Sequence, residues 1–301
     1  MIEKNIDAQI DLVDLVRVFW KEKVLIMITT FVIIILTLFY ALSLPNLYTS
    51  STLLKLSEGG DTGSLSSLAS QYGGLASLAG ISLPSGSNDK SDYVIETIES
   101  REFTSHLLQF NNLKPMLMAF ESYNPLSKVI NYDSEIYDIK SKKWVRDPIN
   151  GNIIPSNLEL HSVIKERLSI SKNKQSGFIN LSFEHKSPSF SKEMLDLIIR
   201  ELNIKVREKD LNESTMALDY LKAQIIKIEQ SEIRKAVFNL IESQLQVQML
   251  ANIKKDYILV TIDKPFIPEN KSSPARAFIM MMGAFFGLIF SCILALIKHY
   301  K

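Results

Sequence analysis

Two long uncharged runs near the ends of the chain dominate its hydrophobic pattern. They cover Val24–Leu44 and Ala277–Ile297, with 21 residues in each. About 20 apolar residues in a helix are enough to cross the hydrocarbon core of a bilayer. A buried helix of a water-soluble protein rarely runs so long without a charged or amide side chain. The first run is also too long for the apolar core of a secretory signal peptide. Both runs are therefore predicted to be transmembrane helices.

Positive charges beside the first run predict the side of the membrane that each part occupies. Arg17, Lys21 and Lys23 precede this run, whereas only Lys55 follows it closely. Lys and Arg concentrate in cytoplasmic flanks, so both termini of a two-span chain are expected in the cytoplasm. The second run has basic residues on both sides and gives no preference. The expected segments are a cytoplasmic start (1–23), a first span (24–44), an exported domain (45–276), a second span (277–297) and a cytoplasmic tail (298–301).

The exported segment is balanced in charge and contains no cysteine. Residues 45–276 hold 28 Lys and Arg and 28 Asp and Glu. A balanced domain has no long-range field that would attract a polyanion, so nucleic acid is not expected as a partner. The one cysteine, Cys292, lies in the second apolar run. The exported domain must therefore fold by its core alone, without a disulfide.

Short strands and helices follow one another through the exported segment, which predicts an α+β fold. Ile179, Leu181 and Phe183 alternate with polar residues, as in a half-buried strand. Ser156 or Asn157 is expected to cap a helix over 158–168. The other expected elements are strands at 48–56, 169–172, 177–185 and 258–262, a helix over 92–108, a Gly/Ser-rich loop at 57–91, and a loop at 123–156 with a short hairpin near Trp144.

A long helical region is expected over 188–255. Pro188 suits a first helical turn, and no proline follows it before Pro265. A helix from about Glu213 to Lys254 would be roughly 60 Å long, more than one small domain covers. Its apolar stripe is expected to pack on another subunit or on a long antiparallel partner; an ordinary core helix with a frayed end is the alternative. The stripe, here named the oligomer stripe, consists of Leu218, Leu221, Ile225 and Ile228.

Residue patterns that carry chemistry are missing from the sequence. It contains no GxxxxGK[ST] loop for a triphosphate and no GxSxG nucleophile elbow. No cysteine and histidine share the spacing of metal ligands. The chain is therefore expected not to be an enzyme and to use no cofactor or metal. Its four histidines lie far apart and are expected to be surface or packing residues: His106, His161, His185 and His299.

Two patterns at the second apolar run are typical of helix packing. Small residues recur at every fourth position, which gives one face on which another helix can approach closely. The generic frequency of small residues in apolar helices is the alternative explanation. A proline-rich segment containing Pro265, Pro268 and Pro274 leads into this run. The small-residue face consists of Gly283, Gly287, Ser291 and Ala295.

The order of these elements resembles the bacterial polysaccharide co-polymerases, the Wzz-type chain-length determinants. The segment Ile10–Trp20 (IDLVDLVRVFW) is similar to the amino-terminal signature of that family. The Gly/Ser/Leu stretch Leu65–Leu83, the strand and helix over Gly177–Leu211, and the long helix are similar too. So is the proline run into a glycine-bearing span. Lys271 departs from the pattern, because it stands where the family's proline ladder often continues.

The resemblance implies two transmembrane helices flanking a periplasmic α/β base domain with a long extended helix, in the inner membrane of a Gram-negative bacterium. It further implies a homo-oligomeric ring that sets the modal length of O-antigen, or of a related polysaccharide, made by a membrane polymerase. The expected partners are other copies of the chain, that polymerase, membrane lipid and, as a candidate ligand, lipid-linked glycan. The kinase-fused branch of the family is not expected, because only residues 298–301 follow the second span.

Three other classes of function stay open at this point. An inner-membrane adaptor of a capsule export machine can share this topology. A two-span sensory receptor would need a signalling module, which the short tail does not offer. A periplasmic hydrolase would need a catalytic constellation. In a deletion strain, loss of a modal polysaccharide band would favour regulation, whereas build-up of polymer inside the cell would favour export.

Overall fold

The computed structural model describes residues 19–57, 86–110, 112–124, 129–149 and 151–300. The chain forms two compact units, one made of its two ends, up to Leu47 and from Lys271, and the other of Tyr48–Asn270. The amino-terminal signature, apart from its last two residues, and most of the Gly/Ser-rich loop at 57–91 lie outside the described residues.

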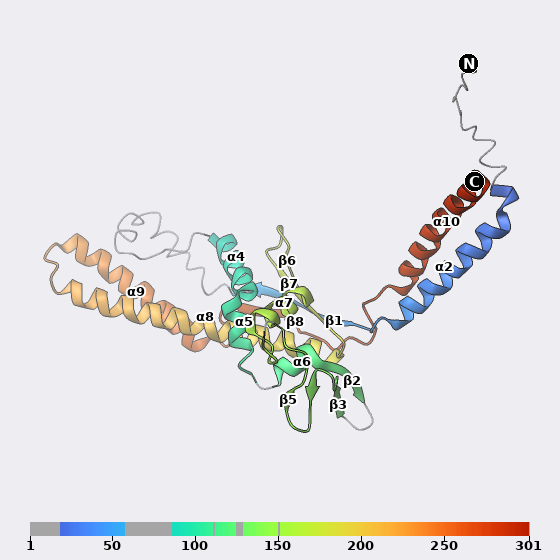
Figure 1. Cartoon of the computed structure of the whole chain (residues 1–301). Helices are drawn as coiled ribbons and strands as arrows, with labels where there is room; N and C mark the ends of the chain where they lie inside the picture. The colour runs from blue at the N-terminus through green and yellow to red at the C-terminus, as the bar shows by residue number, and fades with distance from the viewer. Residues whose placement is uncertain (1–18, 58–85, 111, 125–128, 150, 301) are drawn as a thin grey trace, which may run out of the picture. The chain divides into compact units, whose positions relative to one another are not determined.

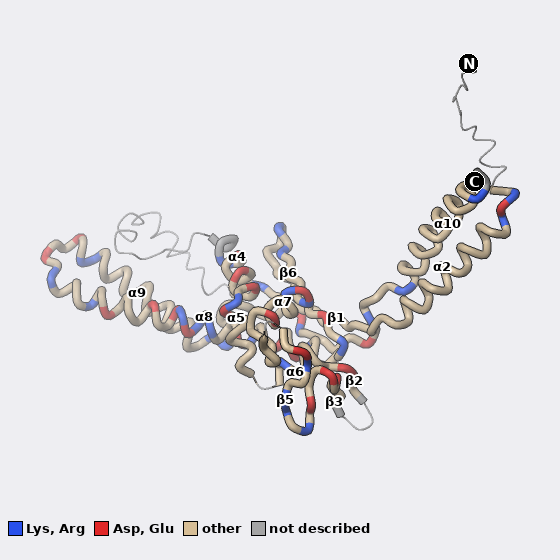
Figure 2. Tube along the Cα trace, viewed as in Figure 1, with Lys and Arg blue, Asp and Glu red and all other residues tan. Residues whose placement is uncertain are grey.

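The smaller unit is an antiparallel pair of apolar helices, α2 (Lys23–Ser43) and α10 (Arg276–Tyr300) (Figure 1). The predicted spans 24–44 and 277–297 fall almost entirely within them. Figure 2 shows Lys, Arg, Asp and Glu only at the ends of the two helices. Both helices are long and apolar enough to cross a membrane. Many of their large side chains are exposed, as expected for helices surrounded by lipid.

The larger unit is built on a four-stranded antiparallel sheet in the order β6-β7-β1-β8. Alternate residues of β7 are enclosed, with Ile179, Leu181 and Phe183 completely buried. This burial confirms the period-2 pattern of the sequence. All four predicted strands are present, with bounds β1 (Tyr48–Leu56), β6 (Leu168–Lys172), β7 (Ile179–His185) and β8 (Leu259–Asp263).

Helix α8 (Pro188–Ile225) packs on the sheet through its first half. Pro188 occupies the first turn as predicted, and the Ser187 side chain caps the helix by accepting from the backbone N–H of Phe190 at 3.3 Å. The Asn203 side chain donates to the Leu259 carbonyl at 3.2 Å and accepts from the Leu259 N–H at 3.1 Å. A buried amide thereby ties the helix to edge strand β8. The fully buried core of this half consists of Met194, Leu195, Ile198 and Leu202.

The remaining elements of the larger unit partly follow the sequence. Ser156 caps α7 as predicted, by accepting from the N–H of Glu159 at 3.1 Å. The predicted helix over 92–108 is wrong as one element, because Ser100 takes an extended conformation and caps a second helix. The hairpin near Trp144 is confirmed, whereas α6 and the hairpin β2–β3 were not predicted. The bounds are α4 (Gly86–Glu99), α5 (Arg101–Leu107), α6 (Leu113–Ala119), β2 (Phe120–Asn124), β3 (Val129–Tyr132), β4 (Tyr137–Asp138), β5 (Lys143–Trp144) and α7 (Asn157–Arg167).

The continuous helix predicted from Glu213 to Lys254 is wrong. Helix α8 ends at Ile225, and α9 (Ser231–Ile253) runs back beside it (Figure 1). The turn has no glycine or proline, so no breaker marks it in the sequence. In this turn the Arg234 guanidinium donates to the Ile228 carbonyl at 2.6 Å, which gives that carbonyl a hydrogen-bond partner. The hairpin buries apolar side chains that one continuous helix would leave in water.

Candidate functional site

The small-residue face of α10 lies against α2 of the same chain. A Cβ atom added to Gly283 would meet Cγ2 and Oγ1 of Thr37 at 2.5 Å. A Cβ atom added to Gly287 would lie 2.9 Å from Cγ2 of Ile33. Only a hydrogen atom fits at either position, so the two glycines let the backbones approach closely.

The other half of the same face carries a polar link between the two helices. The Ser291 hydroxyl lies 2.9 Å from the Thr30 hydroxyl and 2.7 Å from the Gly287 carbonyl. Ser291 and Ala295 are fully buried. Gly283, Gly287 and Ser291 of the small-residue face therefore lie against α2, although the sequence had left the packing partner open.

The proline-rich segment runs beside β1 in an extended form. Pro265 and Pro268 are buried, whereas the intervening Phe266 is half exposed. The Ser50 hydroxyl donates to the Phe266 carbonyl at 2.7 Å. Proline has no N–H to leave unpaired, and it fixes the backbone torsion φ. The segment is thus held without a regular ladder of hydrogen bonds.

A hydrogen-bonded junction stands at the end of the α2–α10 pair, near Pro274. Leu47 and Ser273 form an isolated bridge, with the Leu47 N–H donating to Ser273 at 2.9 Å. The Arg276 guanidinium donates to the Leu44 carbonyl at 3.3 Å and to Oδ1 of Asn46 at 3.1 Å. The start of α10 is thereby fastened to the segment that leaves α2.

The oligomer stripe lies within the α8–α9 hairpin. Leu218 and Leu221 are each only 4% exposed, and Ile225 and Ile228 are half-buried. A hydrogen bond from the Gln248 amide to the Thr215 hydroxyl, 2.9 Å long, joins the two helices beside them. The antiparallel partner that the sequence suggested is therefore the next helix of the same chain. The outer surface of the hairpin still exposes apolar side chains, among them Met216, Tyr220, Ile226, Phe238, Met249 and Ile253.

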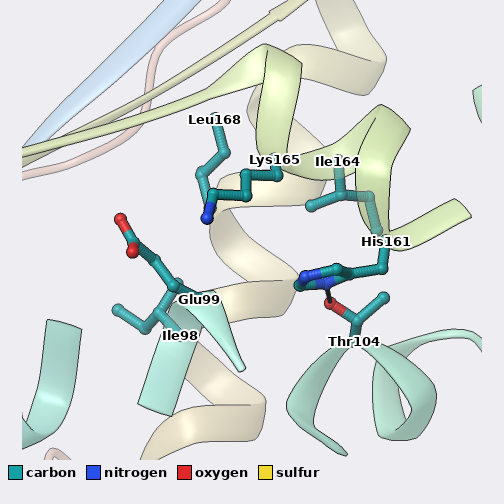
Figure 3. A pocket seen from close by; sticks show the side chains of 7 residues that line it. All are labelled: Ile98, Glu99, Thr104, His161, Ile164, Lys165 and Leu168. Carbon is teal, nitrogen blue, oxygen red and sulfur yellow. Dashed lines mark hydrogen bonds between the residues drawn. The ribbon is translucent and has the colours of Figure 1, made fainter. Parts of the chain in front are cut away.

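A small pocket opens between α4, α5 and α7 (Figure 3). Its volume of about 80 Å³ is well below the several hundred Å³ of ligand pockets. The Nδ1 atom of His161 lies 2.9 Å from the Thr104 hydroxyl. Burial, followed by the charges of Lys165 and Arg101, lowers the pKa of His161, which is therefore neutral at pH 7. The lining residues are Ile98, Glu99, Thr104, His161, Ile164, Lys165 and Leu168.

This pocket does not form a catalytic constellation. A hydroxyl nucleophile needs an imidazole that a third group orients, and in the described part of the chain no carboxylate bonds the second ring nitrogen of His161. Across the described residues there is also no cluster of three His, Cys, Asp or Glu side chains that could hold a metal ion. The geometry at His161 supports packing rather than a chemical step.

His185 joins three elements of the larger unit from a buried position. Its Nε2–H donates to the Met116 carbonyl at 2.9 Å, and its Nδ1 accepts from the Ser187 N–H at 3.0 Å. The ring also packs on Phe190, with 4.6 Å between ring centroids. Burial, with the nearby charge of Arg167, lowers the pKa of His185 to about 3. The neutral ring therefore acts as a structural link at the start of α8.

Comparison with known proteins identifies the first third of the chain. Residues 8–110 match the family model Wzz, described as chain length determinant protein. Over this segment the chain is similar to the Wzz family. The matched segment contains α2, β1, α4 and α5, together with the amino-terminal signature named above. No curated protein matches the sequence.

Two solved structures are similar to this chain at low identity. A full-length bacterial polysaccharide co-polymerase has 13% identity and a TM-score of 0.42, and the alignment covers 96% of this chain and 98% of that one. A fragment of WzzB, a polysaccharide co-polymerase from Salmonella Typhimurium, has 12% identity and a TM-score of 0.36, with 75% and 99% covered.

Sequence reasoning missed the residues of α2 that pack against the small-residue face of α10. Thr30, Ile33 and Thr37 lie three and four positions apart, and so share one side of the helix. Thr30 and Thr37 are two of the few polar positions in this apolar run, which was the available signal, although Thr29 is polar too and bonds within its own helix. Polar side chains inside an apolar span usually face another helix.

Proposed function

We propose that this chain regulates the modal length of a bacterial surface polysaccharide, in the first place the O-antigen of lipopolysaccharide. The match of residues 8–110 to the chain length determinant family carries the proposal. The chain acts as a subunit of a homo-oligomeric ring, together with a membrane polymerase that performs the chemistry. The lack of a catalytic constellation around His161, within the described residues, supports a non-enzymatic role.

The proposed topology places the larger unit in the periplasm. Residues 1–23 and 298–301 are cytoplasmic, the spans are 24–44 and 277–297, and residues 45–276 are periplasmic. The two apolar helices and the positive charges before the first span support this arrangement. A reporter enzyme inserted near Ser87 should be active only outside the cytoplasm, and one fused after Tyr300 only inside. A cytoplasmic signal from the Ser87 insertion would contradict the topology.

In the proposed mechanism, the length of the polymer depends on the geometry of the assembly and on contact with the polymerase. The small-residue face of α10 keeps the two spans as one unit. The oligomer stripe keeps α8 and α9 together, and the hairpin in turn presents its exposed apolar side chains to neighbouring subunits. The proline-rich segment sets the path between the larger unit and α10.

Deletion of the gene, followed by complementation, tests the function. The length distribution of surface polysaccharide, resolved on a gel, should lose its modal band on deletion and regain it with the wild-type chain. Polymerisation itself should continue. Build-up of full-length polymer inside the cell would instead favour the export adaptor, and an unchanged distribution would exclude length control.

A further inference from the structure

A groove on the larger unit, distinct from the pocket at His161, has the size of a ligand site. It lies between α4 and α5 on one side and α8 on the other, with a volume of about 410 Å³. Ligand pockets commonly measure about 300–1,000 Å³. Its residues on α8 extend from Lys205 to Met216, which corresponds to roughly 17 Å along the helix. The groove therefore suits an elongated molecule rather than one small ion.

An aromatic ring supplies part of the apolar surface of this groove. Tyr93 on α4 is 42% exposed. Nζ of Lys209 lies 4.7 Å from the ring centroid and donates to the Tyr93 hydroxyl at 3.0 Å. This bond raises the pKa of Lys209, so the contact persists at neutral pH. The ring is thus held in place before any ligand arrives, and exposed Met216 extends the apolar surface.

Hydrogen-bonding groups of both kinds surround the ring. Glu102 and Lys205 form an ion pair of 2.6 Å across the groove. The exposed Asn212 amide lines the groove, and its side chain has no hydrogen bond with the described residues. Carboxylate oxygens accept, ammonium groups donate, and an amide does both. With Glu213, two acids balance two bases here, so the groove offers no net charge to a polyanion.

We propose that the groove between α4 and α8 binds a neutral, hydroxyl-rich glycan segment, the growing polysaccharide of the proposed function, on which this inference rests. A sugar ring has an apolar C–H face that can lie on Tyr93. Its hydroxyls donate and accept, as the mixed set of Glu102, Lys205 and Asn212 requires. Binding at this groove would give each subunit a direct contact with the polymer whose length is regulated.

Titration calorimetry on the purified full-length protein in detergent tests the inference. The probe is a set of oligosaccharides of one to four repeat units, cut from the surface polysaccharide of the producing cells. Tyr93→Leu should weaken binding about tenfold, which corresponds to about 1.4 kcal/mol. Asn212→Ala, on an exposed helix surface where folding is unaffected, should weaken it as well. The matched control is Tyr123→Leu, because Tyr123 is equally exposed (45%) on β2, outside the groove.

The outcomes separate this inference from the proposed function. Equal affinities for wild type, Tyr93→Leu and Tyr123→Leu would overturn the inference that the groove binds glycan. So would an absence of binding by the wild type, or tighter binding of a sulfated dextran fragment of the same length. If deletion still removes the modal band in that case, the proposed function stands without the groove. If deletion leaves the length distribution unchanged, the proposed function fails whatever the binding data show. Weaker binding by both groove variants, with a shifted modal length in cells, supports the inference.

Discussion

The α2–α10 pair and the α8–α9 hairpin are both antiparallel helix pairs, yet they pack by opposite rules. Between α2 and α10 the contact surface consists of small and hydroxyl residues such as Gly283 and Thr37, and large apolar side chains point outward. Within the hairpin, Leu218 and Leu221 are enclosed. Charged residues recur along both of its helices (Figure 2).

The difference matches the surroundings proposed for each pair, lipid for α2–α10 and water for the hairpin. In lipid, moving a leucine from the outside to the interface gains little, because both environments are apolar, so close approach of backbones and hydrogen bonds dominate. In water, burying a large apolar side chain contributes about 1.5–3 kcal/mol. Small residues at the α2–α10 contact therefore suit a pair with lipid outside, and the enclosed leucines suit a hairpin with water outside.

The largest expected effect is a charge inside the hairpin. Leu221→Asp places a carboxylate at a position that is 4% exposed, and it should destabilise the larger unit by about 3–5 kcal/mol. Urea unfolding of the detergent-solubilised protein, followed by circular dichroism, measures the loss. The control is the neighbouring Tyr220→Asp, since Tyr220 is 56% exposed and should cost less than about 1 kcal/mol. Equal effects of the two changes would mean that the hairpin does not bury its stripe.

The free energy of unfolding of the larger unit should depend on pH, and His185 should be the main cause. The folded state lowers the pKa of His185 from 6.5 to about 3, so the unfolded state binds the extra proton. The stabilising effect is complete above pH 6.5 and is lost as the pH falls towards 3, by a few kcal/mol in total. Replacing His185 with Gln keeps a hydrogen-bond donor but removes the titrating group. The urea midpoint of this variant should therefore change less between pH 6.5 and 5 than that of the wild type. Parallel profiles for both proteins would contradict a neutral, buried ring.

A larger side chain at the contact between α2 and α10 should destabilise the pair moderately. Gly283→Leu forces atoms into the space held by Thr37 and should cost about 1–3 kcal/mol. Cys292 is half-buried in α10 and is the only cysteine, so its alkylation rate in detergent reports opening of the pair. The rate should rise in Gly283→Leu. It should stay unchanged in Met281→Leu, because Met281 is 67% exposed; a rise in both would refute the assigned packing face.

The smallest expected effect is loss of the hydroxyl link between the spans. Thr30→Val removes the hydrogen bond to Ser291 without changing the shape of the side chain, and such bonds contribute about 0.6 kcal/mol between membrane helices. Thr29→Val is the matched control, because the Thr29 hydroxyl bonds to the Leu25 carbonyl of its own helix at 2.8 Å. Cys292 alkylation should be slightly faster in the first variant than in the second. The reverse order would mean that the interhelical bond contributes nothing.

The sequence predicted most elements of the larger unit because local patterns specify them. Alternation gave β7, the Ser156 cap gave α7, and Pro188 marked the start of α8. Two breaks between helices were missed, because neither is marked by a glycine or a proline. Ser100 ends α4 by capping α5, and the turn that begins at Ile226 contains no helix-breaking residue.

Periodicity by itself determined which faces of this chain avoid water and which segments suit lipid. It did not determine what covers each face, because a burial pattern is satisfied by any apolar surface of the right shape. Tertiary structure decided that Gly283 meets Thr37 and that Leu221 packs in a hairpin of its own chain. The groove was likewise decided by tertiary structure. Lys209 and Tyr93 stand 116 residues apart, and only the packing of α4 beside α8 brings a cation to that ring.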